Sequence, residues 1–251
     1  MTHRIFIEDL PQRLEPGDPV QVTGEEAEHA RKSRRLGPGA KVAVIDGKGR
    51  VIEAEISEAK RDLVLRVVAD RREPALEPRV EVWAATPKGG RVDQMIDALS
   101  EVGAAMWRPL DTEWGVVEPR DSKLARLDRV AREASKQCGR AWMMEIGERA
   151  GLGEALDGED GVKIVMADAS GEWYEPSGGG AVRLLVGPEG GWTKHEREKA
   201  ERAGATLARF GAHAMRIEVA APIAAAIIIE TEQRARTGVS PARSDTERSL
   251  G

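Results

Sequence analysis

Two stretches late in the chain carry residue types that suit ligand binding. The first, residues 187–191, reads Gly-Pro-Glu-Gly-Gly and lies between an apolar run and a helix start. Glycines beside a helix start let the backbone approach a ligand closely and turn its N–H groups toward it. No Gly-Lys-Ser/Thr follows, so the loop is no P-loop, and its late position argues against an ordinary dinucleotide-binding domain. It therefore indicates a small-molecule site of another kind.

The second stretch, residues 211–218, leads into an Ala/Ile-rich helix. Arg216 could bind a carboxylate or a phosphate through its guanidinium fork. Glu218 could serve catalysis, or it could only favour the helix N-terminus. His213 is a possible base, although a lone loop histidine is more often solvated and inert.

A third polar group lies on an expected helix. Glu133, Lys136, Gln137 and Arg140 are three and four residues apart, so they share a helix face. That face is either a surface stripe of ion pairs or a polar wall over a substrate groove. Cys138 continues the apolar spacing of the helix and is expected in the core.

Composition excludes several other kinds of site. The four histidines are scattered and Cys138 is the only cysteine, so neither a metal cluster nor an internal disulfide is expected. The sequence contains no Gly-x-Ser-x-Gly motif, the nucleophile turn of many serine hydrolases, so a hydrolase of that kind is not indicated. The chain lacks both a signal-like N-terminus and an apolar run of membrane-spanning length, so we expect a cytoplasmic protein with no membrane contact.

The elements around the two loops predict an α/β fold. An apolar strand over 182–186 precedes the first loop, and Thr193 with Glu196 forms the capping box of the next helix. A strand over 206–210 precedes the second loop. Two loops that leave consecutive strands on one side of a sheet form the usual ligand site of such folds.

The remaining pattern divides the chain in two. Residues 1–72 are expected to form a small β-rich domain, with strands at 4–7, 41–46, 51–56 and 63–68 and a helix over 24–36. That helix would open with a capping box at Thr23 and Glu26 and stop at Gly37-Pro38-Gly39. Residues 73–79 are expected to be a linker, 80–235 the α/β domain, and 236–251 a flexible tail.

The α/β domain is expected to begin with alternating strands and helices. Strands are expected at 80–85, 105–110 and 162–167, helices at 92–102 and 122–138, and a polar loop after residue 167.

The first helix ends with four cations, Arg31, Lys32, Arg34 and Arg35. They form either a solvated helix face with cations near its C-terminus or a phosphate-binding patch. The net charge of −5 excludes a uniformly basic coat but not such a local patch.

These motifs together resemble a known family. It is the SPOUT-class methyltransferases that methylate uridine N3 of small-subunit (16S) ribosomal RNA (RsmE type). The likeness covers nearly the whole chain and rests on residues 29–39, Asp46-Gly47, 88–91, 100–103, 133–140, 185–191 and 211–218. The 187–191 loop is the most specific. The second loop departs from the family pattern at His213, Met215, Ile217 and Val219, while Arg216 and Glu218 are retained.

The resemblance implies a fold and a reaction. It implies a PUA-like β-barrel domain followed by a domain with a deep trefoil knot that holds S-adenosylmethionine. It also implies a homodimer, no metal, and ribosomal RNA as partner, in the assembled 30S particle. Uridine N3 must lose a proton, so a base and a cation that stabilises the uracil anion are needed.

The same resemblance supplies candidate site residues. Arg216 is the expected anion stabiliser, and Glu101, Glu218 and Glu133 are unranked candidates for the base. The expected cofactor residues are Met166, Leu185, Val186, Gly187, Pro188, Glu189, Gly190, Gly191, Phe210, Gly211, Ala214, Met215 and Arg216. The expected RNA-binding residues are Arg31, Lys32, Arg34, Arg35, Lys88, Arg91, Gln137 and Arg140.

Two alternatives remain. One is a methyltransferase of the same superfamily that acts on transfer RNA or on a ribose 2′-hydroxyl. The other is a non-catalytic RNA-binding assembly factor, which the altered second loop would permit.

Overall fold

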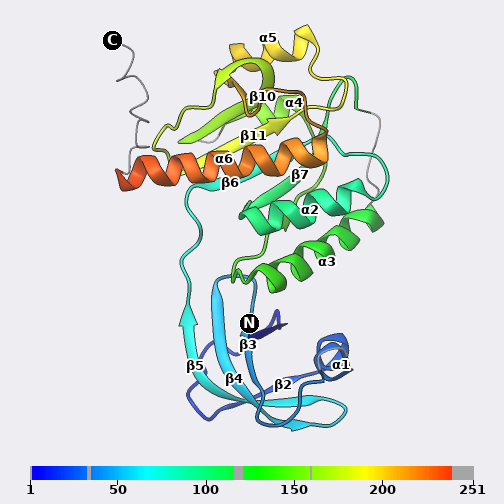
Figure 1. Cartoon of the computed structure of the whole chain (residues 1–251), viewed down its shortest axis with the longest axis vertical. Coiled ribbons are helices and arrows are strands. Elements are labelled where there is room, and N and C mark those ends of the chain that lie inside the picture. The colour runs from blue at the N-terminus through cyan, green and yellow to red at the C-terminus, as the bar shows by residue number, and fades with distance from the viewer. Residues whose placement is uncertain (1, 33–34, 116–120, 159, 239–251) are drawn as a thin grey trace, which may run out of the picture.

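In a computed structural model, the chain forms two sheets that lie one beyond the other along the long axis of the molecule (Figure 1). The structure describes residues 2–32, 35–115, 121–158 and 160–238. The N-terminal sheet contains β1 (His3–Phe6), β2 (Pro19–Val22), β3 (Lys41–Ile45), β4 (Arg50–Ala59) and β5 (Leu63–Arg72). The second sheet begins with β6 at Arg79.

The five-stranded sheet has the order β1-β3-β4-β5-β2, with only the β1–β3 pair parallel. Alternating side chains from β4 and β5 fill its core together with Ala27 and Ala30 of helix α1 (Gly24–Lys32). The β3–β4 hairpin at residues 47–49 is confirmed. Strand β2 was missed, because only four residues with a leading proline carry its signal.

Helix α1 ends earlier than expected, at Lys32 rather than near Leu36. The Leu36 N–H donates to the Ala30 carbonyl (3.2 Å), and Arg35 has a φ of 53°. A left-handed residue just after a helix is a common way to end it. The Glu26 carboxylate accepts hydrogen bonds from the Phe6 N–H and Lys136 Nζ.

The second sheet is entirely parallel, with the order β12-β10-β11-β6-β7-β8, and β9 also pairs with β7. Its strands are β6 (Arg79–Ala84), β7 (Met106–Asp111), β8 (Glu145–Ile146), β9 (Ala150–Gly151), β10 (Val162–Trp173), β11 (Ala181–Val186) and β12 (Thr206–Arg209). The short β8 and β9 were missed. Strand β10 continues through a bulge to Trp173, where a loop was expected from residue 168.

Helices cover both faces of this sheet (Figure 1). One face packs against α2 (Arg91–Val102), α3 (Asp121–Cys138) and α6 (Ile217–Thr237). The other packs against α4 (Leu152–Leu156) and α5 (Lys194–Arg202). Burial on both faces explains the continuous apolar runs in β6 and β11. Helix α6 continues two residues into the expected tail, and residues 239–251 lie outside the described part.

The two parts of the chain meet at the β3–β4 hairpin. The Met143 N–H donates to the Gly47 carbonyl (2.9 Å), and the Gly49 N–H donates to the Ala141 carbonyl (3.2 Å). Gly49 has a φ of 92°, and an added Cβ would lie 2.5 Å from the Trp142 ring. A side chain at Gly49 would therefore both strain the turn and push the two parts of the chain apart.

Helix α3 strengthens this junction. The Lys136 side chain is only 7% exposed, and its Nζ lies 2.7 Å from the Glu26 carboxylate and 2.8 Å from the Glu133 carboxylate. Glu133 and Lys136 thus belong to an ion-pair group that reaches the N-terminal domain. Cys138 is exposed, which corrects the expectation of a core position, and Ala134 and Ser135 are buried at this end of the helix instead.

A candidate cofactor cavity at the carboxyl edge of the parallel sheet

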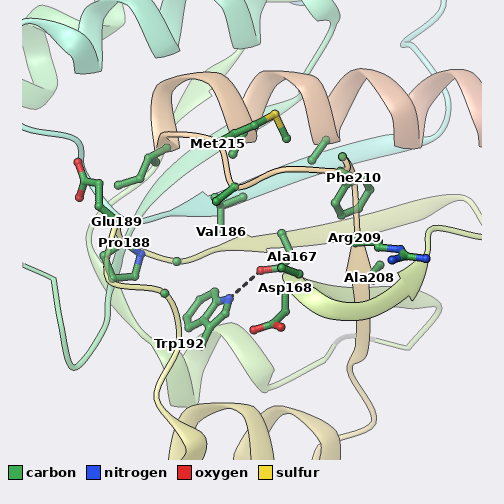
Figure 2. A pocket seen from close by; sticks show the side chains of 18 of the residues that line it. Ala167, Asp168, Val186, Pro188, Glu189, Trp192, Ala208, Arg209, Phe210 and Met215 are labelled. Atoms are coloured by element: carbon green, nitrogen blue, oxygen red, sulfur yellow. Dashed lines mark hydrogen bonds between the residues drawn. The ribbon is translucent and has the colours of Figure 1, made fainter.

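A cavity of about 350 Å³ lies where β11 and β12 end, beside the bulge in β10 (Figure 2). Because these strands are parallel neighbours, the loops that follow them leave the same edge of the sheet. The β11 loop contributes residues 187–191, and the β12 loop contributes Gly211, His213, Ala214 and Met215. The structure thus brings the two loops singled out in the sequence around one cavity.

Two hydrogen bonds hold the first loop in place. The Gly191 N–H donates to the Pro188 carbonyl (2.8 Å), and Trp192 Nε1 donates to the Ala167 carbonyl at the start of the β10 bulge (2.8 Å). An added Cβ at Gly187 would lie 2.9 Å from the Trp192 ring. The loop backbone therefore packs tightly on the tryptophan and faces the cavity with little side-chain cover.

The capping box that follows this loop is confirmed. The Thr193 hydroxyl accepts from the Glu196 N–H (3.1 Å), and the Glu196 carboxylate accepts from the Thr193 N–H (2.8 Å). Helix α5 therefore starts at a fixed place relative to the cavity.

Most of the expected cofactor residues line the cavity. They are Val186, Gly187, Pro188, Glu189, Gly190, Gly191, Phe210, Gly211, Ala214 and Met215. Met166 and Leu185 are fully buried in the cluster on the α4–α5 face of the sheet, and they are not among the lining residues. Arg216 is also not among them. It is the exposed N-cap residue of α6, between Met215 and Ile217, which both line the cavity.

Sequence reasoning missed several lining residues, among them Asp168, Trp192, Arg197 and Arg209. The Asp168 side chain is 10% exposed, and its Oδ1 accepts from the Ser170 N–H and hydroxyl at 2.8 Å and 2.5 Å. The Arg197 guanidinium lies 3.6 Å from Asp168. A signal was available, because Asp168 directly follows the apolar run 162–167, where the sequence predicts the carboxyl end of a strand.

The three candidate bases lie in different places. The Glu218 side chain is 8% exposed in the first turn of α6, and its Oε1 lies 3.4 Å from Arg91 Nη1. Arg91 also lies 3.8 Å from Glu189 of the first loop. Glu133 pairs with Lys136 near helix α1, and Glu101 is exposed at the far end of α2 from Arg91. Only Glu218 directly adjoins cavity-lining residues.

The expected RNA-binding residues are spread over several surfaces. Lys88 is exposed, and Arg91 is one-third exposed, after β6. Gln137 is exposed on α3. Arg140 Nη1 donates to the Ser100 and Ala104 carbonyls at 2.8 Å and 2.9 Å, and burial lowers the pKa of its guanidinium. These bonds give Arg140 a structural role at the C-terminus of α2.

The basic patch of the first helix is mixed in charge. Lys32 pairs with Glu28, and Arg31 shares a surface hollow with Glu25 and Glu28. Arg35 is exposed, and Arg34 lies outside the described residues. The phosphate-binding role of this basic patch stays a prediction.

The described residues lack two further kinds of feature. No helix there combines the length and apolar character needed to cross a membrane. No group of three or more His, Cys, Asp or Glu residues there could hold a metal ion.

Comparison with known proteins decides the family. A family described as "RNA methyltransferase domain" matches residues 75–229, and one described as "RNA methyltransferase PUA domain" matches residues 22–68. The chain belongs to the RNA methyltransferase family. The expected enzyme class and the two-part α/β fold are thereby confirmed, while the trefoil knot stays a prediction.

Relatives cover most of the chain. "Ribosomal RNA small subunit methyltransferase E" from Synechocystis sp. is 27% identical over 83% of this chain and 72% of its own length. The protein of the same name from Bacillus subtilis is 26% identical over 91% and 97%.

Solved structures share the fold of this RNA methyltransferase. The ribosomal RNA small subunit methyltransferase E from Neisseria gonorrhoeae, solved with S-adenosyl methionine, has a TM-score of 0.81 at 24% identity, covering 94% of this chain and 98% of that one. A methyltransferase from Legionella pneumophila, solved with the bound cofactor, has a TM-score of 0.79 at 23% identity, with coverage of 94% and 98%.

Proposed function

We propose that this RNA methyltransferase uses S-adenosylmethionine to methylate uridine N3 in small-subunit (16S) ribosomal RNA. The observation that carries the proposal is the cavity between the 187–191 loop and the β12 loop, with the Glu218 carboxylate beside it. The names of the relatives from Synechocystis and Bacillus subtilis support ribosomal RNA of the small subunit as the substrate.

The cavity suits S-adenosylmethionine in size and in chemistry. Apolar side chains such as Phe210, Met215 and Ile217 offer surface to an adenine ring and a thioether-like chain. The glycines of the two loops leave backbone groups accessible to its polar atoms. The Asp168 carboxylate is placed to accept from hydroxyl or ammonium groups. Bound there, S-adenosylmethionine supplies an electrophilic methyl group.

We assign removal of the uridine N3 proton to Glu218. Its Oε1 faces Arg91, while its buried Oε2 has no hydrogen-bond partner among the described residues. A buried carboxylate oxygen without a partner has lost its hydration, so a hydrogen bond from a donor of the substrate would stabilise it. Arg91 holds the carboxylate in place through the other oxygen.

We assign stabilisation of the uracil anion to Arg216. Its exposed guanidinium stands at the N-terminus of α6, where the free N–H groups and helix dipole also favour negative charge. The guanidinium and the helix N-terminus together lower the free energy needed to remove the weakly acidic N3 proton. Glu101 and Glu133 are not brought to this place within one subunit.

The partners follow from the same proposal. Lys88 and Arg91 supply cations at the cavity edge, and the N-terminal domain supplies Arg31, Lys32 and Arg35 for contact with ribosomal RNA in the assembled 30S particle. We also propose a homodimer, for which the exposed Val219 and Ile223, one turn apart on α6, are candidate contact residues. The proposed location is the cytoplasm.

Nucleoside mass spectrometry of ribosomal RNA from a deletion strain tests the function. Loss of 3-methyluridine from the small-subunit RNA, restored by the wild-type gene, is the expected result. An unchanged level would contradict the proposal, and loss of a transfer RNA or 2′-O-methyl mark instead would identify a different substrate. Calorimetric titration with S-adenosylmethionine is the second measurement, since absent binding would indicate a non-catalytic RNA-binding protein.

A further inference from the structure

Trp114 is an exposed aromatic residue beside the candidate site. It follows β7, and its side chain is 52% exposed. The turn that carries it is closed by the Gly115 N–H, which donates to the Thr112 carbonyl (3.0 Å). A single exposed apolar residue needs no special explanation. The surroundings of Trp114, however, give a reason to assign this residue a role.

The Trp114 turn is fixed to the start of helix α5. The Glu113 N–H donates to Glu196 Oε1 (2.9 Å), while Glu196 Oε2 accepts from the Thr193 N–H (2.8 Å). Glu196 is 3% exposed, so both bonds are shielded from water. One buried carboxylate therefore joins the turn after β7 to the segment that follows the 187–191 loop.

The Trp114 ring packs against Gly190. A Cβ built on Gly190 would lie 3.0 Å from Trp114 Cε3. Gly190 lines the cofactor cavity, whereas Trp114 is not among its lining residues. The indole thus contacts a loop of the cavity without forming its wall, which favours a ligand other than the cofactor.

Cations share this edge of the sheet with Trp114. Strand β6 lies between β7 and β11 and is parallel to both, so the three loops after these strands leave the same edge. The loop after β6 carries exposed Lys88, and α2 starts there with Arg91. An exposed aromatic ring with neighbouring cations is the combination that binds single-stranded nucleic acid.

We propose that Trp114 stacks on an unpaired nucleobase of the RNA substrate, next to the nucleotide that is methylated, while Lys88 contacts an adjacent phosphate. This assignment rests on the proposed function. A methyltransferase that reacts at uridine N3 must expose an edge that base pairing would cover, so the local RNA has to be unpaired. A rigid indole can hold such RNA in place with little loss of side-chain entropy.

Variants of Trp114 test the stacking role. With assembled small subunits from the deletion strain as substrate, Trp114→Ala should raise KM about tenfold or more, the factor expected when one base loses its stacking partner. Trp114→Phe should recover most of that loss, because it keeps an aromatic face. The dissociation constant of S-adenosylmethionine should be unchanged in both variants.

Tryptophan fluorescence gives a second readout that a structural role would not move. Decauridylate should quench the wild-type emission, and Trp114→Phe should lose most of that quenching. Trp173→Phe is the matched control, because Trp173 is equally exposed (53%) on β10, and it should keep the quenching.

Specific results would overturn the assignment. Wild-type KM in Trp114→Ala, or full quenching in Trp114→Phe, would remove Trp114 from RNA binding. Weakened S-adenosylmethionine binding in Trp114→Ala would place the ring in the cofactor site instead. If the wild-type protein forms no 3-methyluridine, the proposed function fails, while the fluorescence comparison still decides the stacking.

Discussion

Glu218 Oε1 lies 3.4 Å from Arg91 Nη1, across 127 residues of sequence. The Glu218 side chain is 8% exposed, and Arg91 also lies 3.8 Å from Glu189 of the 187–191 loop. One cation thus links the starts of α2 and α6 to the loop that lines the cavity. In the reaction that we propose, this pair places a buried carboxylate beside the cofactor cavity, where it would take the proton.

Glu218→Gln should lower the rate of methyl transfer about 10²- to 10⁴-fold, the usual contribution of a general base. The amide keeps the size of the side chain but cannot take the proton. Single-turnover transfer to small subunits measures the rate, and calorimetry should show unchanged binding of S-adenosylmethionine.

Glu101→Gln is the matched variant for this prediction. Glu101 lies ten residues from Arg91 along α2, about 15 Å at the rise of a helix. The Glu101→Gln substitution should therefore change the rate of methyl transfer less than twofold. A large loss in Glu101→Gln with none in Glu218→Gln would show that the base has been assigned to the wrong residue.

Gly190→Val should weaken binding of S-adenosylmethionine tenfold or more. The new Cβ would already lie 3.0 Å from the Trp114 ring, so the loop has to shift, and the branched side chain would cover backbone that faces the cavity. Calorimetric titration checks the affinity. Gly37→Val controls for a general glycine effect, because an added Cβ there meets nothing within 4 Å. Wild-type affinity in Gly190→Val would mean that the loop is only a turn.

Glu232 joins α6 to the segment after β10. Its carboxylate accepts from the Tyr174 hydroxyl (2.6 Å), the Ser177 N–H (2.8 Å) and the Gly178 N–H (2.8 Å). Burial opposes the charged form, but these hydrogen bonds outweigh it and hold the pKa of Glu232 below its ordinary value. Burial, together with the Glu232 carboxylate, raises the pKa of Tyr174.

Glu232→Gln should lower the free energy of unfolding by about 1.5 to 3 kcal/mol at pH 7, the range for hydrogen bonds to a charged group. A lowered folded-state pKa gives stability that is present above the unfolded pKa and is lost as pH falls through the folded value. The difference between wild type and variant should therefore shrink below about pH 4.3.

Urea unfolding at pH 7 and at pH 4 and below measures this difference. Glu230→Gln is the control, because Glu230 forms an exposed ion pair with Arg234 and should contribute little. Equal losses in the two variants, or a difference that does not depend on pH, would contradict the account.

The sequence alone was sufficient for features that depend on near neighbours. Thr193 and Glu196 are three residues apart, so their capping box follows from spacing, and the glycine loop before them could be located as a ligand-binding turn. The parallel strands could be predicted because burial on both faces leaves continuous apolar runs. Cys138 shows the limit of such patterns, because the helix turns it outward at the last position.

Tertiary structure decided which distant residues meet. Neither the pairing of Arg91 with Glu218 nor the contact of Trp114 with Gly190 has a local signal, because each depends on the order β12-β10-β11-β6-β7. The same holds for Arg140, which binds the carbonyls at the end of α2 instead of facing an open groove. Spacing along the chain fixes which side of an element a residue occupies, but only packing of the whole chain fixes what lies opposite. The sequence therefore determined the loops of this site, and the folded sheet determined the carboxylate, cation and aromatic ring beside them.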